Sequence, residues 1–174
     1  IHQFIGDTVG EARIARTAGI RPYTLQYIGT MPMVYELRQT TVWALGIPLG
    51  LIAWSGLVFG AFRNLRRRRI GEILLLAWVI PFFLILAPFE VKFLRYMFPV
   101  MPVLILLGSS LMIVVWDWTR NHAPRLAPAV MGGIVFVLLA TIFYAFAFES
   151  VYRRDHPAVQ ASQWLNANAS LGTL

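Results

Sequence analysis

The sequence Glu-Val-Lys-Phe-Leu-Arg-Tyr-Met-Phe-Pro-Val-Met-Pro, residues 90–102, decides how this chain folds. It brings an acid, two bases and a phenol together between two uncharged apolar runs, 73–89 and 97–116: Glu90, Lys92, Arg95 and Tyr96. Fixed charges between two segments of membrane length are expected at a water–lipid boundary. There they can meet an anion that is itself partly in lipid, such as a lipid phosphate. We therefore expect the rest of the chain to hold this Glu90–Tyr96 cluster at that depth.

The composition indicates a membrane protein. Apolar residues make up 58% of the chain and charged residues 13%, against roughly 45–50% and about 25% in an ordinary soluble domain. The apolar excess is concentrated in four blocks, which predicts an all-α integral membrane fold. The net charge of +7 points first to membrane topology and anionic headgroups. Nucleic acid is not an expected partner, because the basic residues are not interleaved with aromatics on a polar face.

The four apolar blocks predict about four transmembrane helices, since about 20 apolar residues cross a bilayer core of roughly 30 Å. The predicted spans are Thr41–Phe62, Ile70–Phe89, Met97–Trp116 and Leu126–Phe148. The first is expected to loosen near its start, where Gly46, Pro48 and Gly50 fall. In the fourth, the Gly132-Gly133 pair is expected to let another helix approach closely.

The chain divides into three regions on this basis. Residues 1–40 are predicted to form an extracytoplasmic segment, with a short helix capped by Asp7 or Thr8 and then a Tyr-rich loop, Pro22–Tyr35. Residues 41–149 form the four-helix transmembrane region. Residues 150–174 form an extracytoplasmic tail with a short helix over Ala158–Asn168, the start of a truncated polar domain. Because Ile1 stands where an initiator methionine would, we expect a fragment of a longer protein.

The distribution of Lys and Arg predicts the orientation of the spans. Five arginines lie in the loop 63–69, and Arg120 and Arg125 follow the third span, which places seven basic residues on one side. The loop between the second and third spans has only Lys92 and Arg95. The Arg63–Arg69 loop is therefore expected in the cytoplasm. The cluster, the Tyr-rich loop and the tail then share the outer side, where they could build one site.

The cluster suits a phosphate or diphosphate. Lys92 and Arg95 are three residues apart, so on a helical turn they would point the same way, one offering a compact charge and the other a planar fork. The alternative is that both side chains only fix the depth of the third span. A catalytic base in this chain would be Glu90, Asp155 or Glu149. There is no cysteine, paired-His spacing or Gly-rich phosphate loop, so no metal or nucleotide site is predicted.

Several stretches resemble the C-terminal half of bacterial phospholipid-carrier-dependent GT-C glycosyltransferases, the group related to protein O-mannosyltransferases and aminoarabinose transferases. The most specific is Lys-Phe-x-Arg-Tyr-x-x-Pro-x-x-Pro at residues 92–102. The others are Pro-Tyr-Thr-Leu-Gln-Tyr-Ile-Gly-Thr at 22–30, Trp-Ala-Leu-Gly-Ile-Pro-Leu-Gly at 43–50 and Ala-Ser-Gln-Trp-Leu at 161–165. Their order fits across roughly residues 22–170.

The resemblance implies transfer of a sugar from a polyprenyl-phosphate carrier to an acceptor on the outer face of the bacterial inner membrane. Lys92, Arg95 and Tyr96 would hold the carrier phosphate. The carrier or sugar would also contact Gln26, Tyr27, Thr30, Tyr35 and Glu90. The lipid-linked sugar is a substrate, and no cofactor is implied.

The same resemblance limits what this chain does alone. Members of the family use an acidic base in the first outer loop of the N-terminal half, which would lie outside this chain, so the chain alone is expected to be inactive. The expected partners are the carrier lipid, anionic lipids and other membrane subunits. The alternative function is a non-catalytic transmembrane accessory or scaffold subunit of a larger membrane complex.

Overall fold

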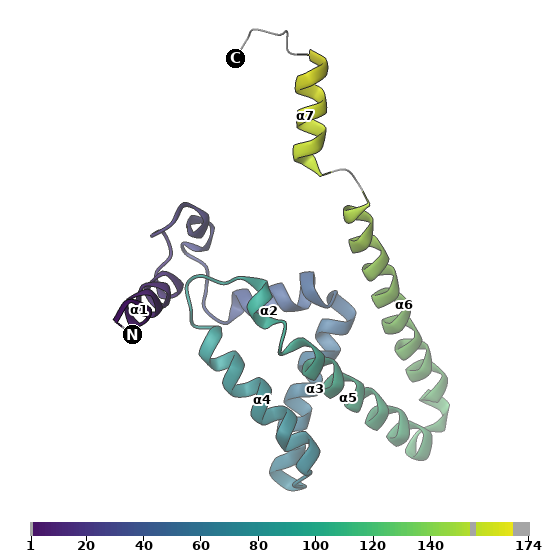
Figure 1. Cartoon of the computed structure of the whole chain (residues 1–174). Helices are drawn as coiled ribbons and strands as arrows, with labels where there is room; N and C mark the ends of the chain where they lie inside the picture. Colours follow the sequence, from purple (N-terminus) through teal and green to yellow (C-terminus); the bar gives the residue numbers. More distant parts are fainter. Residues whose placement is uncertain (1, 154–155, 169–174) are drawn as a thin grey trace.

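A computed structural model of the protein describes residues 2–153 and 156–168. Over these ranges the chain forms helices and no β-strand, which confirms the all-α prediction (Figure 1). In chain order they are α1 His2–Arg16, η1 Pro22–Tyr27, α2 Val34–Gln39, η2 Thr40–Ala44, α3 Ile47–Arg66, α4 Ile70–Leu86, η3 Leu94–Met97, α5 Met101–His122, η4 Pro124–Leu126, α6 Ala127–Tyr152 and α7 Pro157–Asn168. The segment η2 is a π-helix, and the other η segments are 3₁₀ helices.

Two helices in the described part of the chain are long and apolar enough to cross a membrane. They are α5, with 22 residues, and the helical stretch that starts at Pro124 and contains α6. The helix α4 is apolar but shorter, with 17 residues. Only 22% and 6% of the most apolar stretches of these two helices are buried. Neither helix is therefore covered as the core helix of a soluble protein would be.

The first predicted span is interrupted at Gly46, as its glycines and proline suggested. The π-helix η2 ends at Ala44, and α3 begins at Ile47 with Pro48 in its first turn. Between them Gly46 has φ 76°, a left-handed conformation that glycine adopts without strain. Proline supports a new helix start here because its missing N–H is not needed in the first turn.

The ends of two other helices differ from prediction. The helix α5 begins at Met101 and not at Met97, since Pro99 and Pro102 favour a helix start after the separate turn η3. The helix α1 begins at His2, so the predicted cap at Asp7 or Thr8 is wrong. Thr8 lies inside this helix, and its hydroxyl donates to the Phe4 carbonyl at 2.7 Å.

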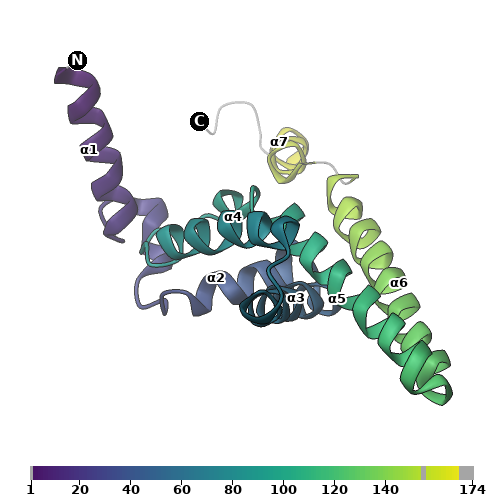
Figure 2. The ribbon, with the colours of Figure 1, turned by 90° about the horizontal axis from the view of Figure 1, so that it is seen from below.

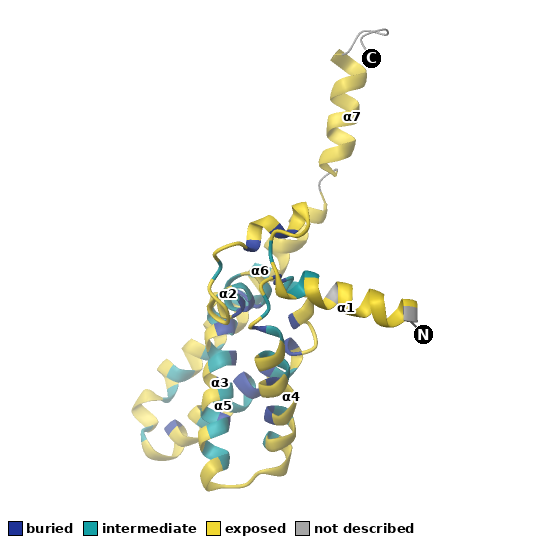
Figure 3. Ribbon diagram, turned by 90° about the vertical axis from the view of Figure 1, so that its left-hand side faces the viewer, coloured by how far each residue is buried: buried dark blue, intermediate teal, exposed yellow. Residues whose placement is uncertain are grey.

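The core lies between α3, α4 and α5, where Figure 3 shows the buried positions gathered. Its fully buried members include Ala53 of α3, Val79 of α4 and Leu104 of α5. The helices α3 and α5 approach closely at Gly56 and Gly108, and a Cβ added at Gly108 would lie 2.9 Å from the Cα of Ala53. Small residues thus allow the two backbones to touch.

The close approach predicted at Gly132-Gly133 is wrong. No heavy atom beyond the helix's own neighbouring backbone lies within 4 Å of a Cβ built at either glycine in the described structure. The helix α6 returns from the end of α5 (Figures 1 and 2) and meets the start of α3 farther along, where a Cβ built at Gly46 would lie 3.2 Å from the Tyr144 ring. Val137 is the one buried residue of α6.

Candidate functional site

The connection between α4 and α5, residues 87–100, folds back against the N-terminal segment. The Val91 amide donates to the Ala15 carbonyl at 3.1 Å, and the Glu90 carboxylate accepts from the Ala18 amide at 2.6 Å. The cluster and the N-terminal segment that carries the Tyr-rich loop therefore lie together. The described residues of α7 are all exposed, so this part of the tail does not join them (Figure 3).

Lys92 is buried, with 2% of its surface exposed. Its ammonium donates to the Thr30 hydroxyl at 2.7 Å and to the Glu90 carbonyl at 3.4 Å, and it lies 5.5 Å from the centre of the Tyr35 ring. Burial lowers the pKa of Lys92, while the carboxylates of Glu36 and Glu90 act in the opposite direction. The lysine thus ties the connection to the Tyr-rich loop.

Lys92 and Arg95 do not point the same way, which corrects the prediction from their spacing. A three-residue spacing aligns side chains only within a helix, and Lys92 precedes η3. Arg95 is exposed, and its guanidinium carbon lies 4.5 Å from the centre of the Phe93 ring and 5.5 Å from that of Tyr96. Only one of the two predicted cations is therefore open to a ligand from this side.

Arg95 and Tyr96 line a cavity of about 630 Å³, named here the Arg95 cavity. Tyr23 and Phe93 supply further aromatic walls, and α1 and the end of α4 supply apolar ones, among them Leu86. Tyr96 is 39% exposed at this surface. The cavity joins one fixed cation to an apolar lining, the combination that suits an anion attached to a lipid.

The other face of η3 borders a second cavity of about 430 Å³, named here the apolar groove. Leu94 and Phe98 line it from the connection, facing Trp43, Tyr144 and Phe148 from η2 and α6. The Tyr144 hydroxyl donates to the Trp43 carbonyl at 2.7 Å, which holds α6 against η2. The short turn η3 therefore presents a cation to one cavity and apolar side chains to the other.

The remaining predicted contacts do not line the Arg95 cavity. Thr30 holds Lys92. Tyr27 is buried and packs edge-on against Tyr35, with ring centres 6.0 Å apart. Burial raises the pKa of both tyrosines. Gln26 is exposed and donates to the Tyr23 carbonyl at 3.2 Å. Their contact with carrier or sugar stays a prediction.

Glu36 is a residue that the sequence did not single out. It lies on α2 with 2% of its surface exposed, and its Oε2 has no hydrogen-bond partner within the described structure. Burial raises the pKa of Glu36 to about 7, against the opposing effect of Lys92. A signal existed: a helix running from Val34 into the first span puts Glu36 and Thr40 on one face, and both are buried.

Of the three acids predicted as candidate bases, the two that the structure describes make separate contacts. Glu90 caps the turn after α1 by accepting from Ala18. Glu149 is exposed on α6 and accepts from Arg153 at 3.3 Å. Asp155 lies outside the described residues. No acidic side chain that the structure describes lines the Arg95 cavity.

No protein-family model, no curated protein and no solved structure matches this chain. The resemblance to the carrier-dependent glycosyltransferases therefore stays a prediction from the quoted sequence stretches.

Proposed function

We propose that this chain is part of a membrane glycosyltransferase that moves a sugar from a polyprenyl-phosphate carrier to an acceptor on the outer face of the membrane. The observation that carries the proposal is the placement of η3 between two cavities. Arg95 and Tyr96 line the Arg95 cavity, and Leu94 and Phe98 line the apolar groove. A binding site for a lipid phosphate needs a cation that binds the phosphate and an apolar surface that contacts the lipid chain.

In this proposal the chemistry divides between this chain and the N-terminal half that the family resemblance implies. In the transfer, the bond from C1 of the sugar to the carrier phosphate oxygen breaks, and a bond from C1 to the acceptor oxygen forms. The acceptor proton passes to a base, and the carrier leaves as polyprenyl phosphate. Arg95 would donate to the phosphate oxygens and stabilise the negative charge that develops as the carrier leaves. The base would come from outside the described residues, as the family resemblance implies.

The proposal places α3, α4, α5 and α6 across the bacterial inner membrane, with the Arg63–Arg69 loop in the cytoplasm. The geometry of α4 supports this arrangement. Its first residue, Ile70, follows that loop, and its last residue, Leu86, lines the Arg95 cavity. A helix of 17 residues separates its ends by about 25 Å. The arginine-rich loop and the Arg95 cavity are thus held at opposite ends of one apolar helix.

Replacing Arg95 tests the proposal. In the full-length protein, Arg95→Ala is expected to weaken binding of undecaprenyl phosphate by about 10- to 100-fold, since a hydrogen bond to a charged group contributes about 1.5–3 kcal/mol. Native mass spectrometry of the detergent-purified protein measures the bound carrier. The matched control is Arg38→Ala, an exposed arginine that lines none of the described cavities. It is expected to bind the carrier as the parent protein does.

The same experiment distinguishes the glycosyltransferase proposal from the second candidate function, a non-catalytic transmembrane subunit of a larger complex. One observation favours that candidate, because the Arg95 cavity has no acid among its described lining residues. If Arg95→Ala binds the carrier as tightly as the parent protein, the glycosyltransferase proposal fails and the subunit proposal leads.

A further inference from the structure

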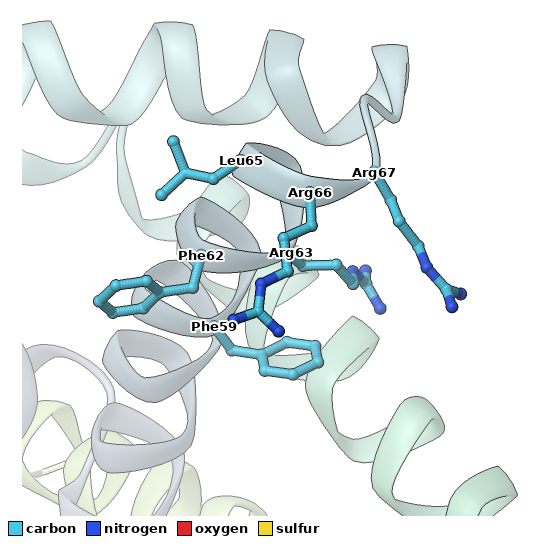
Figure 4. A pocket seen from close by; sticks show the side chains of 6 residues that line it. All are labelled: Phe59, Phe62, Arg63, Leu65, Arg66 and Arg67. Atoms are coloured by element: carbon cyan, nitrogen blue, oxygen red, sulfur yellow. The ribbon is translucent and has the colours of Figure 1, made fainter.

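A separate cavity of about 560 Å³ lies at the C-terminal end of α3 (Figure 4). Its lining combines three apolar side chains with three arginines: Phe59, Phe62, Leu65, Arg63, Arg66 and Arg67. In Figure 4 the side chain of Arg67 points away from Phe62 and Leu65. The lining therefore offers both positive charge and apolar surface.

Arg63 is fixed in place and neutralised by its neighbours. It forms an ion pair with Glu72 of α4 and donates to the Ser110 hydroxyl of α5 at 3.1 Å. Its guanidinium carbon also lies 4.9 Å from the centre of the Phe59 ring. Arg63 thus connects α3 to α4 and α5 and forms a fixed part of the cavity lining. Its positive charge is already neutralised by the Glu72 carboxylate.

The turn from α3 to α4 is held by one asparagine. The Asn64 side chain accepts from the Arg69 amide at 2.8 Å and donates to Glu72 at 2.9 Å. These contacts hold the backbone of the turn that carries Arg66 and Arg67.

No acidic side chain in the described structure forms an ion pair with Arg66 or Arg67. Both are exposed, and neither forms an ion pair or a side-chain hydrogen bond with the described residues. The carbonyl end of a helix carries only about half a negative charge, which is too little to balance two arginines. Two adjacent guanidinium groups beside an apolar wall call for a ligand that is both anionic and apolar.

We propose that this cavity binds one anionic phospholipid, with its phosphate against Arg66 and Arg67 and its acyl chains along Phe59, Phe62 and Leu65. A diacyl lipid satisfies both sides of the cavity, whereas a soluble phosphate would leave Phe62 and Leu65, which are 67% and 83% exposed, in water. The proposal requires that this end of α3 meets a bilayer surface. It does not depend on sugar transfer or on the Arg95 cavity.

Adjacent arginines provide a matched pair of variants. Arg67 lines the cavity and Arg68 does not, yet both are exposed and both substitutions remove one positive charge. We would load the full chain in detergent with phosphatidylglycerol, or with phosphatidylcholine as the zwitterionic reference, and count bound lipid by native mass spectrometry. Arg67→Gln is expected to weaken retention of phosphatidylglycerol about five-fold, the effect of about 1 kcal/mol per arginine near a membrane surface. Arg68→Gln is expected to retain it.

Two further arms distinguish a lipid site from a general field of positive charge. Phe62→Ser leaves the charges unchanged and is expected to lose phosphatidylglycerol, and glycerol 3-phosphate is expected not to displace the lipid at equal concentration. Equal losses in Arg67→Gln and Arg68→Gln would overturn the proposal, because they would show a diffuse electrostatic effect. Displacement by glycerol 3-phosphate, or equal retention of phosphatidylcholine, would overturn it as well.

Discussion

At the scale of single residues, the buried side chains of Glu36 and Lys92 affect each other's pKa. Lys92 donates to Thr30, whereas one oxygen of Glu36 has no partner in the described structure. The raised pKa of Glu36 means that the folded protein binds its proton more tightly than the unfolded chain does. This acid therefore contributes to stability while it is protonated.

The stability of the protein should accordingly depend on pH through Glu36. Its pKa moves from 4.5 to about 7 on folding, so the stabilisation is complete below about pH 4.5 and is lost as the pH rises to about 7, by at most about 3 kcal/mol. We expect the melting temperature in detergent to fall between pH 5 and pH 8. Glu36→Gln should remove most of this slope, and an unchanged slope in that variant would contradict the assignment.

At the scale of helices, the close contact between α3 and α5 lies at the centre of the hydrophobic core. It depends on Gly56, where an added Cβ would strike the Leu107 carbonyl group and the Gly108 amide. Those are backbone atoms, which cannot rotate away as a side chain can. The two helices can meet at this distance only because no side chain separates them.

The substitution Gly56→Ala should therefore destabilise the protein by about 1–3 kcal/mol, the usual cost of overpacking. The matched control is Gly132→Ala on α6, where the space around the added methyl is open. It is expected to be neutral or to stabilise by up to about 1 kcal/mol, because alanine favours the helix. Thermal unfolding in detergent compares the two variants. A Gly56→Ala protein that melts with the parent would show that α3 and α5 can separate freely.

At the scale of the whole molecule, two helices among the described residues have the length and apolarity of a span, and the proposed arrangement uses four. The absence of cysteine from the sequence makes this testable, because every introduced cysteine is the single label. We expect Gln26→Cys to react with an impermeant maleimide from outside the inner membrane and Arg68→Cys to react only after permeabilisation. Both side chains are exposed in the structure. Labelling of both positions from one side would mean that α3 does not cross.

The sequence by itself determined the helical class and the approximate positions of the long helices, and it indicated that the first span would loosen near Gly46. These follow from local properties: apolar length, proline without an N–H, and the freedom of glycine to adopt positive φ. It also identified Arg95 and Tyr96 as neighbours at one surface, since adjacency along the chain survives in η3.

Only the tertiary structure decided which polar groups are buried and which glycines are in contact. Lys92 turned inward to Thr30, a partner 62 residues away, and Glu36 became buried beside it. Close helix packing fell on Gly56 and Gly108, not on Gly132 and Gly133. Each of these outcomes depends on which segments meet in space. The spacing of residues along one chain carries information about one helix face, but not about the partner that covers it.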